Sequence, residues 1–208
     1  MKRQSFAKEK TKENLLTDIE VDQLKGACQG FIDIFLVSML LYTGMRVSEL
    51  IHMRQGWIDW EMKLIRIPRE QACSCSECKR EFRNKKGKVT KPSGVWMPKT
   101  PDAIRSIPIV PELEDLLQRY LREYETVREI IPSRGAAYYR LRRISRYAEI
   151  GHPVFPHALR GTFATILARK QFTSSEMMST MGWKSIAAAD SYIKLSGAAV
   201  KQAFKKKW

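Results

Sequence analysis

The feature that most constrains the fold of this chain is its longest apolar stretch, from Phe31 to Tyr42, which is broken by Asp33 and Ser38. It is shorter than the ~18 residues that a membrane-spanning helix needs, so it predicts a helix buried inside the protein. Such a helix must be covered by other elements. A chain of 208 residues with 44% hydrophobic content can supply this cover with one substantial core, or with one core and a small appendage.

Helical periodicity governs most of the remaining chain. Thr17 and Glu20 have the spacing of a capping box, which predicts a helix that runs through Gln29. A helix over 31–43 should end at Gly44, because glycine commonly follows the last turn of a helix. Further helices are expected over 46–53, from 112 onward with apolar faces over 113–121 and 138–147, and over 158–170, 174–181, 187–193 and 197–205.

Short strands are expected in the front half of the chain. Residues 57–60 and 63–68 have strand character on either side of a turn at Glu61-Met62, and 104–110 has that of a returning strand. The sequence therefore predicts a mainly α domain with a small three-stranded antiparallel sheet (α+β). Residues 69–98 form a long insertion in the sheet region that is rich in Cys and Lys. A connection of this length is often functional or disordered.

The charge of the chain points to a polyanionic partner. Lys and Arg total 37 against 22 acidic residues, which gives a net charge of +15, and the pI is near 9.8. Nucleic acid is the simplest explanation, and solubility is the alternative. The polar N-terminal residues 1–15 predict a flexible basic lead-in and lack the apolar segment of a secretory signal. We therefore expect a cytoplasmic protein without a membrane span.

Four segments together resemble the tyrosine recombinase (phage-type integrase) family, from Leu16 to Lys205. They are YTGMRVSEL (42–50), PKTPDAIRSIPI (98–109), PHALRGTFAT (156–165) and MGWKSIAAADSYI (181–193). Each is weak alone, but all four occur in the order and approximate spacing of the family. The resemblance implies the family's catalytic-domain fold, and it implies that Tyr192 is the nucleophile, nine residues after Trp183. The catalytic residues that it implies are Arg46, Lys99, His157, Arg160, Trp183 and Tyr192.

The chemistry of phosphodiester cleavage supports the same residues. Guanidinium groups match phosphate oxygens and stay charged, so Arg46 and Arg160 can stabilise the pentacovalent transition state without a metal ion. His157 is the natural proton acceptor for Tyr192, because the ordinary pKa of histidine is ~6.5 and that of tyrosine is ~10. Trp183 cannot transfer a proton, but its indole N–H can donate to phosphate and its rings can support the tyrosine.

The leaving 5′-hydroxyl needs a proton, for which Lys99 is the best candidate donor and Lys91 and Lys88 are rivals. Glu49 is expected to hold Arg46 or a backbone amide in place. The other six tyrosines fall in predicted helices upstream of His157 and Arg160, where core or surface packing explains them. They are Tyr42, Tyr120, Tyr124, Tyr138, Tyr139 and Tyr147.

The segment CSCSEC in the insertion departs from the short hairpin usual in the family. Cys73, Cys75 and Cys78 are candidate zinc ligands, with Cys28 or His52 as a fourth. The pattern lacks the second CxxC pair of a zinc ribbon, so reduced, unliganded cysteines on a mobile loop are the favoured interpretation. Structural zinc is the alternative. The basic residues of the insertion are expected to contact phosphate or simply to be solvated; they are Arg80, Arg83, Lys85, Lys86 and Lys88.

The resemblance implies site-specific recombination or integration through a 3′-phosphotyrosyl intermediate, with no cofactor or ATP. The implied partner is double-stranded DNA, with four subunits on two duplexes in the full reaction. The catalytic domain is expected over 16–208, and the family's N-terminal DNA-clamping domain is expected to be absent from this chain. Three alternative functions remain: a type IB topoisomerase, a catalytically inactive basic DNA-binding module, and a zinc-dependent nucleic-acid binder built on CSCSEC.

Overall fold

The computed structural model describes residues 11–197 and Phe204, and its centre is the predicted apolar helix. This helix, α2 (Phe31–Thr43), buries nine of its residues and ends at Gly44, whose φ of 58° is left-handed. Its one buried acid, Asp33, accepts from Arg140 and from Arg143 at 2.7 Å each. These bonds offset the cost of burying the carboxylate.

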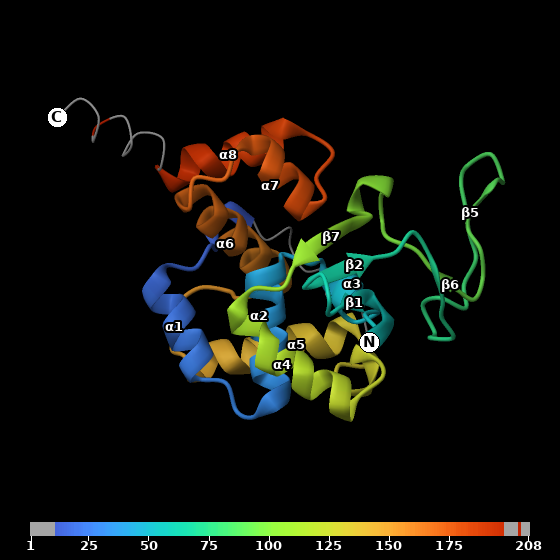
Figure 1. Ribbon diagram of the computed structural model, residues 1–208, viewed down its shortest axis with the longest axis horizontal. Coiled ribbons are helices and arrows are strands. Elements are labelled where there is room, and N and C mark those ends of the chain that lie inside the picture. Colours follow the sequence, from blue (N-terminus) through green and yellow to red (C-terminus); the bar gives the residue numbers. More distant parts are fainter. Residues whose placement is uncertain (1–10, 198–203, 205–208) are drawn as a thin grey trace, which may run out of the picture.

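Three helices pack against α2. They are α1 (Asp18–Gly26), α4 (Pro111–Glu123) and α5 (Arg134–Tyr147) (Figure 1). The predicted capping box of Thr17 and Glu20 is present, but α1 ends at Gly26, earlier than the expected Gln29. The chain turns there toward Gly30, whose φ of 82° favours glycine and precludes helix. Tyr147 was expected on the apolar face of α5 but is 57% exposed.

The three-stranded sheet forms as expected, with strand order β1-β2-β7. Its strands are β1 (Ile58–Asp59), β2 (Leu64–Ile67) and β7 (Arg105–Pro108), all antiparallel. Ile65 pairs with Ile107, and both are buried. Trp57, expected in the first strand, instead ends a 3-10 turn (Gln55–Trp57).

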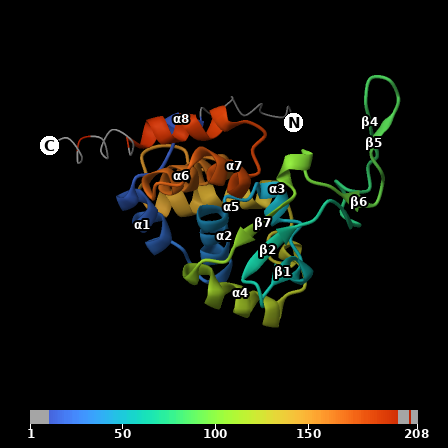
Figure 2. The same ribbon diagram turned by 45° about the horizontal axis from the view of Figure 1, so that its top comes forward.

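Residues 69–98, here called the insertion arm, leave the sheet between β2 and β7 and extend beyond the helical body (Figures 1 and 2). Their strands pair as two small sheets: β3 (Gln71–Ala72) with β6 (Val95–Trp96), and β4 (Phe82–Arg83) with β5 (Val89–Lys91). Three residues of the arm are buried, namely Cys73, Cys78 and Trp96. The arm therefore has almost no apolar core of its own.

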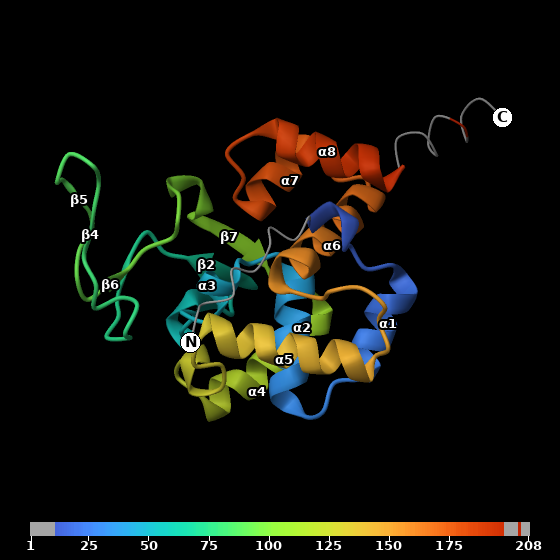
Figure 3. The same ribbon diagram turned by 180° about the vertical axis from the view of Figure 1, so that it is seen from behind.

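The last three described helices form a second, smaller core, and the first of them packs against α2. They are α6 (Pro156–Arg169), α7 (Ser174–Met181) and α8 (Ile186–Ser196), seen from behind in Figure 3. The helix expected over 197–205 lies outside the described residues, apart from Gly197, the C-cap of α8, and Phe204.

The N-terminal segment that the structure describes runs along α6. A 3-10 turn, η1 (Thr11–Glu13), packs on this helix, and the Leu16 N–H donates to the Thr162 hydroxyl at 2.9 Å. Within the described residues, no helix is both long and apolar enough to cross a membrane.

Candidate active site

The first turn of α6 presents a histidine and an arginine to one pocket. Pro156 occupies the first helical position, where its missing N–H costs nothing. His157 and Arg160 follow, three residues apart on one helix face, while Ala158 and Leu159 between them are fully buried. The sequence spacing therefore places both polar groups on the same wall of the pocket.

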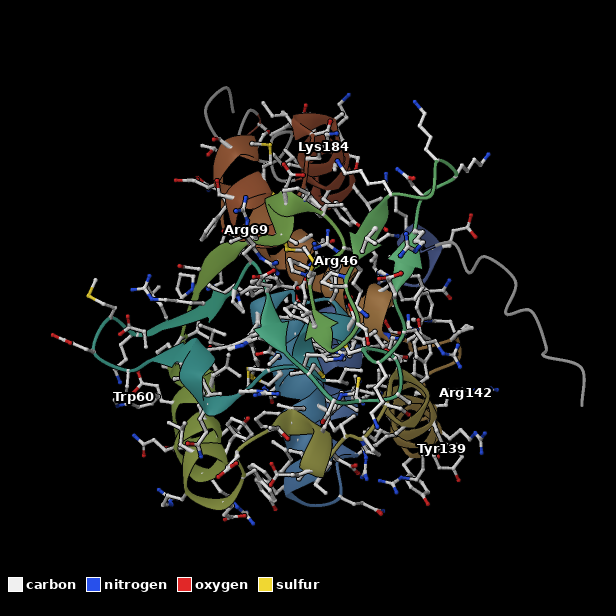
Figure 4. The ribbon with its side chains drawn as sticks, turned by 90° about the vertical axis from the view of Figure 1, so that its right-hand side faces the viewer. Arg46, Trp60, Arg69, Tyr139, Arg142 and Lys184 are labelled. Atoms are coloured by element: carbon white, nitrogen blue, oxygen red, sulfur yellow. The ribbon has the colours of Figure 1, made fainter. Side chains whose placement is uncertain are left out.

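Arg46 reaches this pocket from the start of a second short helix, α3 (Val47–Leu50), for which it is the N-cap. Glu49 holds it by two bonds. The Arg46 backbone N–H donates to Glu49 Oε2 at 2.9 Å, and Arg46 Nη1 donates to Oε1 at 2.8 Å. Both positioning roles expected of Glu49 are observed. Figure 4 shows Arg46 near the middle of the molecule, below Lys184.

The pocket has a volume of about 220 Å³ and gathers five of the six predicted catalytic residues. Lys99 is not part of its lining. The lining residues are Thr11, Arg46, His157, Arg160, Gly161, Trp183 and Tyr192. Three of the predicted residues come from α3 and α6, and Trp183 and Tyr192 come from the α7–α8 region, so the pocket exists only in the folded chain.

Two glycines support the arginines through their carbonyl groups. Arg160 donates to the carbonyls of Gly44 and Met181, and Arg46 Nη2 donates to the carbonyl of Gly182 at 3.2 Å. Gly44 and Gly182 are left-handed residues that end α2 and α7. A Cβ on Gly44 would lie 2.6 Å from the Phe163 ring, and one on Gly182 would lie 2.9 Å from a backbone oxygen. Both positions therefore require glycine.

A third arginine, Arg105 on β7, belongs to the same network and was not predicted. Its side chain is 5% exposed, and its Nη2 donates to Glu49 Oε2 at 3.1 Å. Its Nε donates to the carbonyl of Thr180 at 2.8 Å, which joins β7 to α7. The sequence contained one signal for the position of Arg105. Side chains alternate between the two faces of a strand, so Arg105 lies on the same face as Ile107, which is buried.

The charges of this network shift several pKa values. Burial alone would raise the pKa of Glu49, but the three guanidinium groups around it outweigh burial and hold that pKa below its ordinary value. Loss of hydration, followed by the charges of Arg46 and Arg105, lowers the pKa of Arg160 to about 9, so it stays cationic at neutral pH. With one carboxylate among three arginines, the pocket remains positive.

The histidine of the pocket is held in its neutral form. His157 is open to the pocket, yet the surrounding protein removes part of its hydration. This loss, followed by the charges of nearby cations with Arg160 foremost, lowers the pKa of His157 below its ordinary value. A neutral imidazole has a free lone pair, so His157 can accept a proton at neutral pH.

Tyr192 lies on α8 with its ring stacked against Trp183, the centroids 5.4 Å apart and the planes at 9°. Its hydroxyl reaches toward α6, where a Cβ added to Gly161 would lie 3.3 Å from it. Burial raises the pKa of Tyr192, although the charge of Arg160 opposes this. The phenol is therefore protonated at neutral pH, and it could act as a nucleophile only with a proton acceptor beside it.

The other tyrosines do not line this pocket. Tyr120 is fully buried in the main core, and Tyr42 accepts a hydrogen bond from Lys25 at 3.1 Å. Tyr139 is 73% exposed and lies on α5 beside Arg142, well below Arg46 in Figure 4.

Lys99 is exposed on the loop between β6 and η3 (Pro101–Ala103), near enough for its charge to contribute to the lowered pKa of His157. Its rivals lie farther along the arm. Lys91 Nζ donates to the carbonyl of Glu77 at 3.2 Å and lies over the Phe82 ring. Lys88 is exposed beside the β4–β5 pair.

The phage integrase family matches the chain over residues 13–198. The chain belongs to this family. Its catalytic-domain fold, mainly helical with a small antiparallel sheet, agrees with that membership. The tyrosine recombinase XerA of Saccharolobus solfataricus is 23% identical to this phage integrase family chain over 181 residues, or 86% of the chain. The chain spans about half (52%) of that relative's length.

Two solved structures share the fold of this family member. The Tn1549 transposon integrase in complex with transposon right end DNA has a TM-score of 0.65 at 21% identity, covering 92% of this chain and 66% of that one. The catalytic domain of bacteriophage HP1 integrase has a TM-score of 0.57 at 19% identity. That comparison covers 92% of this chain and 93% of the HP1 domain.

The candidate zinc ligands of this phage integrase family chain lie outside the pocket, at the base of the insertion arm. Cys73, Cys75 and Cys78 come together with His52, and their possible ligand atoms all lie within 4.8 Å of one another. Cys28 is not part of this group; its thiol donates to the carbonyl of Leu24 at 3.3 Å. Of the two candidates for a fourth ligand, His52 is the one beside the three cysteines.

Proposed function

We propose that this chain is the catalytic domain of a site-specific DNA recombinase or integrase, which cuts and rejoins DNA through a 3′-phosphotyrosyl intermediate. One observation carries the proposal: Tyr192 shares a single positive pocket with Arg46, His157 and Arg160. A phenol beside guanidinium groups and a neutral imidazole has what nucleophilic attack on a phosphodiester requires.

The two pocket arginines are the proposed clamp for the scissile phosphate. Arg160 and Arg46 each donate to backbone carbonyls that fix their planes. A guanidinium carries five N–H groups, so bonds of this kind leave others free to face a phosphate. Charge that builds on the equatorial oxygens during attack would then meet donors that are already oriented.

Proton transfer is assigned to two residues. His157 accepts the proton of Tyr192 as the phenol oxygen bonds to phosphorus. The bond to the 5′-oxygen breaks, and Lys99 supplies the proton that completes the 5′-hydroxyl. The intermediate keeps the energy of the phosphodiester, so attack by a 5′-hydroxyl rejoins the strand without ATP. Trp183 supports Tyr192 by stacking and can donate its indole N–H to phosphate.

Double-stranded DNA is the proposed partner, and the net charge of +15 supports it. The Tn1549 transposon integrase structure contains DNA. Most basic residues of the insertion arm are exposed, and in this proposal they contact the phosphate backbone. Assembly of four subunits on two duplexes is the proposed form of the complete reaction.

A covalent-trapping experiment tests the function. A nicked duplex that loses a short fragment after cleavage should leave the chain attached to the 3′ end. The adduct should form in buffer without magnesium, and added magnesium should not accelerate it. A 5′ linkage, or a strict need for magnesium, would contradict the mechanism. Exchange between two sites, scored beside plasmid relaxation, separates a recombinase from a type IB topoisomerase.

Replacing Lys99 by alanine is expected to slow cleavage while DNA affinity stays nearly unchanged, because one cation among 37 contributes little to binding. A substrate with a 5′-bridging sulfur should restore the rate of Lys99→Ala, since a thiolate leaves without a proton. The same substrate should not restore Arg46→Ala. Lys91→Ala is the control, and rescue of Lys91→Ala but not of Lys99→Ala would mean that Lys91 is the acid.

A further inference from the structure

We propose that His52, Cys73, Cys75 and Cys78 bind a zinc ion that fastens the insertion arm to the body of the protein. The four residues come from two separate parts of the chain. His52 follows α3, and the cysteines lie in the turn after β3. Three thiolates and one imidazole are a common ligand set of structural zinc sites.

The spacing of the ligand atoms fits tetrahedral zinc. His52 Nε2 lies 3.5 Å from Cys75 Sγ and 3.5 Å from Cys78 Sγ. Zinc bonds of about 2.3 Å to sulfur and about 2.0–2.1 Å to nitrogen give a tetrahedral N–S edge of about 3.6 Å. These two separations are thus already close to those that the ion would require, and all four ligand atoms lie within 4.8 Å of one another.

The imidazole is oriented with its free nitrogen toward the cysteines. His52 Nδ1 lies 2.7 Å from the carbonyl of Ser48, so Nδ1 carries the proton and Nε2 keeps the lone pair. Arg128 Nη2 donates to Nε2 at 3.0 Å, and an ion would displace this bond. Zinc with three thiolates has one net negative charge, so the Arg128 guanidinium beside it would remain favourably placed.

The protein backbone preshapes the cysteine turn. The Cys78 N–H donates to the Cys75 carbonyl at 3.0 Å, and the Cys73 N–H donates to the Gly94 carbonyl at 2.8 Å. Trp96 stacks on the His52 ring with centroids 5.4 Å apart. A second pocket, of about 310 Å³, opens onto His52, Cys73 and Cys75 and offers the ion an entry route.

The arm needs such an anchor. Of residues 69–98, two of the three that are buried are Cys73 and Cys78 themselves. Ordering each residue costs about 1–2 kcal/mol, which so few buried groups cannot offset, and small units without a core commonly depend on a metal. The ion would also tie the arm, and hence the loop of Lys99, to the end of the helix that Arg46 begins.

Metal content tests the proposal directly. The full chain, purified under reducing conditions, should contain one zinc ion per molecule, and Cys75→Ser should lose it. Cys28→Ser is the matched control and should keep it, since Cys28 lies outside the cluster. Cobalt in place of zinc should give thiolate-to-metal charge-transfer and tetrahedral ligand-field bands. This spectrum needs no variant, so it decides the matter even if Cys75→Ser does not fold.

A second readout follows the arm itself. Trypsin should cut within residues 69–98 at least about tenfold faster in Cys75→Ser than in Cys28→Ser, because the metal no longer opposes local opening. Wild-type chain without zinc and without a cobalt spectrum would overturn the proposal. So would a disulfide among the three cysteines, or retention of zinc by Cys75→Ser. None of these outcomes depends on recombinase activity.

Discussion

Replacing Tyr192 by phenylalanine is expected to abolish covalent attachment to DNA completely while the protein still folds and binds DNA like the parent. Phenylalanine keeps the ring that stacks on Trp183 at 5.4 Å and loses only the oxygen that would bond to phosphorus. Attack by water in place of the phenol would release a free 3′-phosphate, so it could not produce the covalent adduct. The loss should therefore exceed that of any other single substitution.

The measurement is adduct formation on the nicked substrate, followed by peptide mapping of the linked residue. Tyr139→Phe is the matched control, because Tyr139 is 73% exposed on α5 and far from the pocket. The control should form the adduct at the parent rate. An active Tyr192→Phe protein, or an adduct mapped to another tyrosine, would remove Tyr192 from its role.

The second large effect is expected from Arg46→Lys, which should lower the cleavage rate by about 10²–10³, as loss of one oriented donor to a developing oxyanion does. Lysine keeps the charge but lacks the planar fork. Its single nitrogen cannot keep the bonds to Glu49 and the Gly182 carbonyl and still present a planar pair of N–H groups to phosphate, which the proposed clamp requires. DNA affinity should change little.

Single-turnover cleavage rates measure this effect. Arg66→Lys serves as the control, because Arg66 is an exposed arginine of β2 that pairs with Asp59 at 2.6 Å. Equal rates for Arg46→Lys and the parent would show that charge alone suffices, which contradicts a bidentate clamp.

Much of the architecture could be predicted from the sequence, because its signals are local. The capping box at Thr17, the helix ending at Gly44 and the alternation around Ile107 each depend on residues a few positions apart. The same holds for the His157–Arg160 pair, whose spacing alone places both on one face. The mainly helical class and the small three-stranded antiparallel sheet followed from these elements.

Contacts between distant segments could not be predicted in this way. The bond from Arg105 to Glu49 joins positions 56 residues apart. The Cys75–His52 contact spans 23 residues, and the sequence offered His52 only as an alternative to Cys28. No periodicity connects such pairs. They appear only when β7 lies beside α3 or when the arm folds back on the body. The predicted end of α1 at Gln29 was wrong. The helix ends at Gly26, and the chain then turns toward Gly30, whose positive φ does not fit a helix.

The seating of α8 on α6 and α7 has a consequence for rate. Among its described residues, α8 buries only Ala189, whereas α2 buries nine. Because α8 carries Tyr192 and packs on α6 and α7, any opening of this helix would remove the Tyr192 hydroxyl from the pocket. Every loss of about 1.4 kcal/mol in seating free energy lowers the seated-to-unseated ratio tenfold. Turnover then scales with the occupancy of one state, and a substitution at Ala189 would slow the reaction while every group that touches phosphate stayed intact.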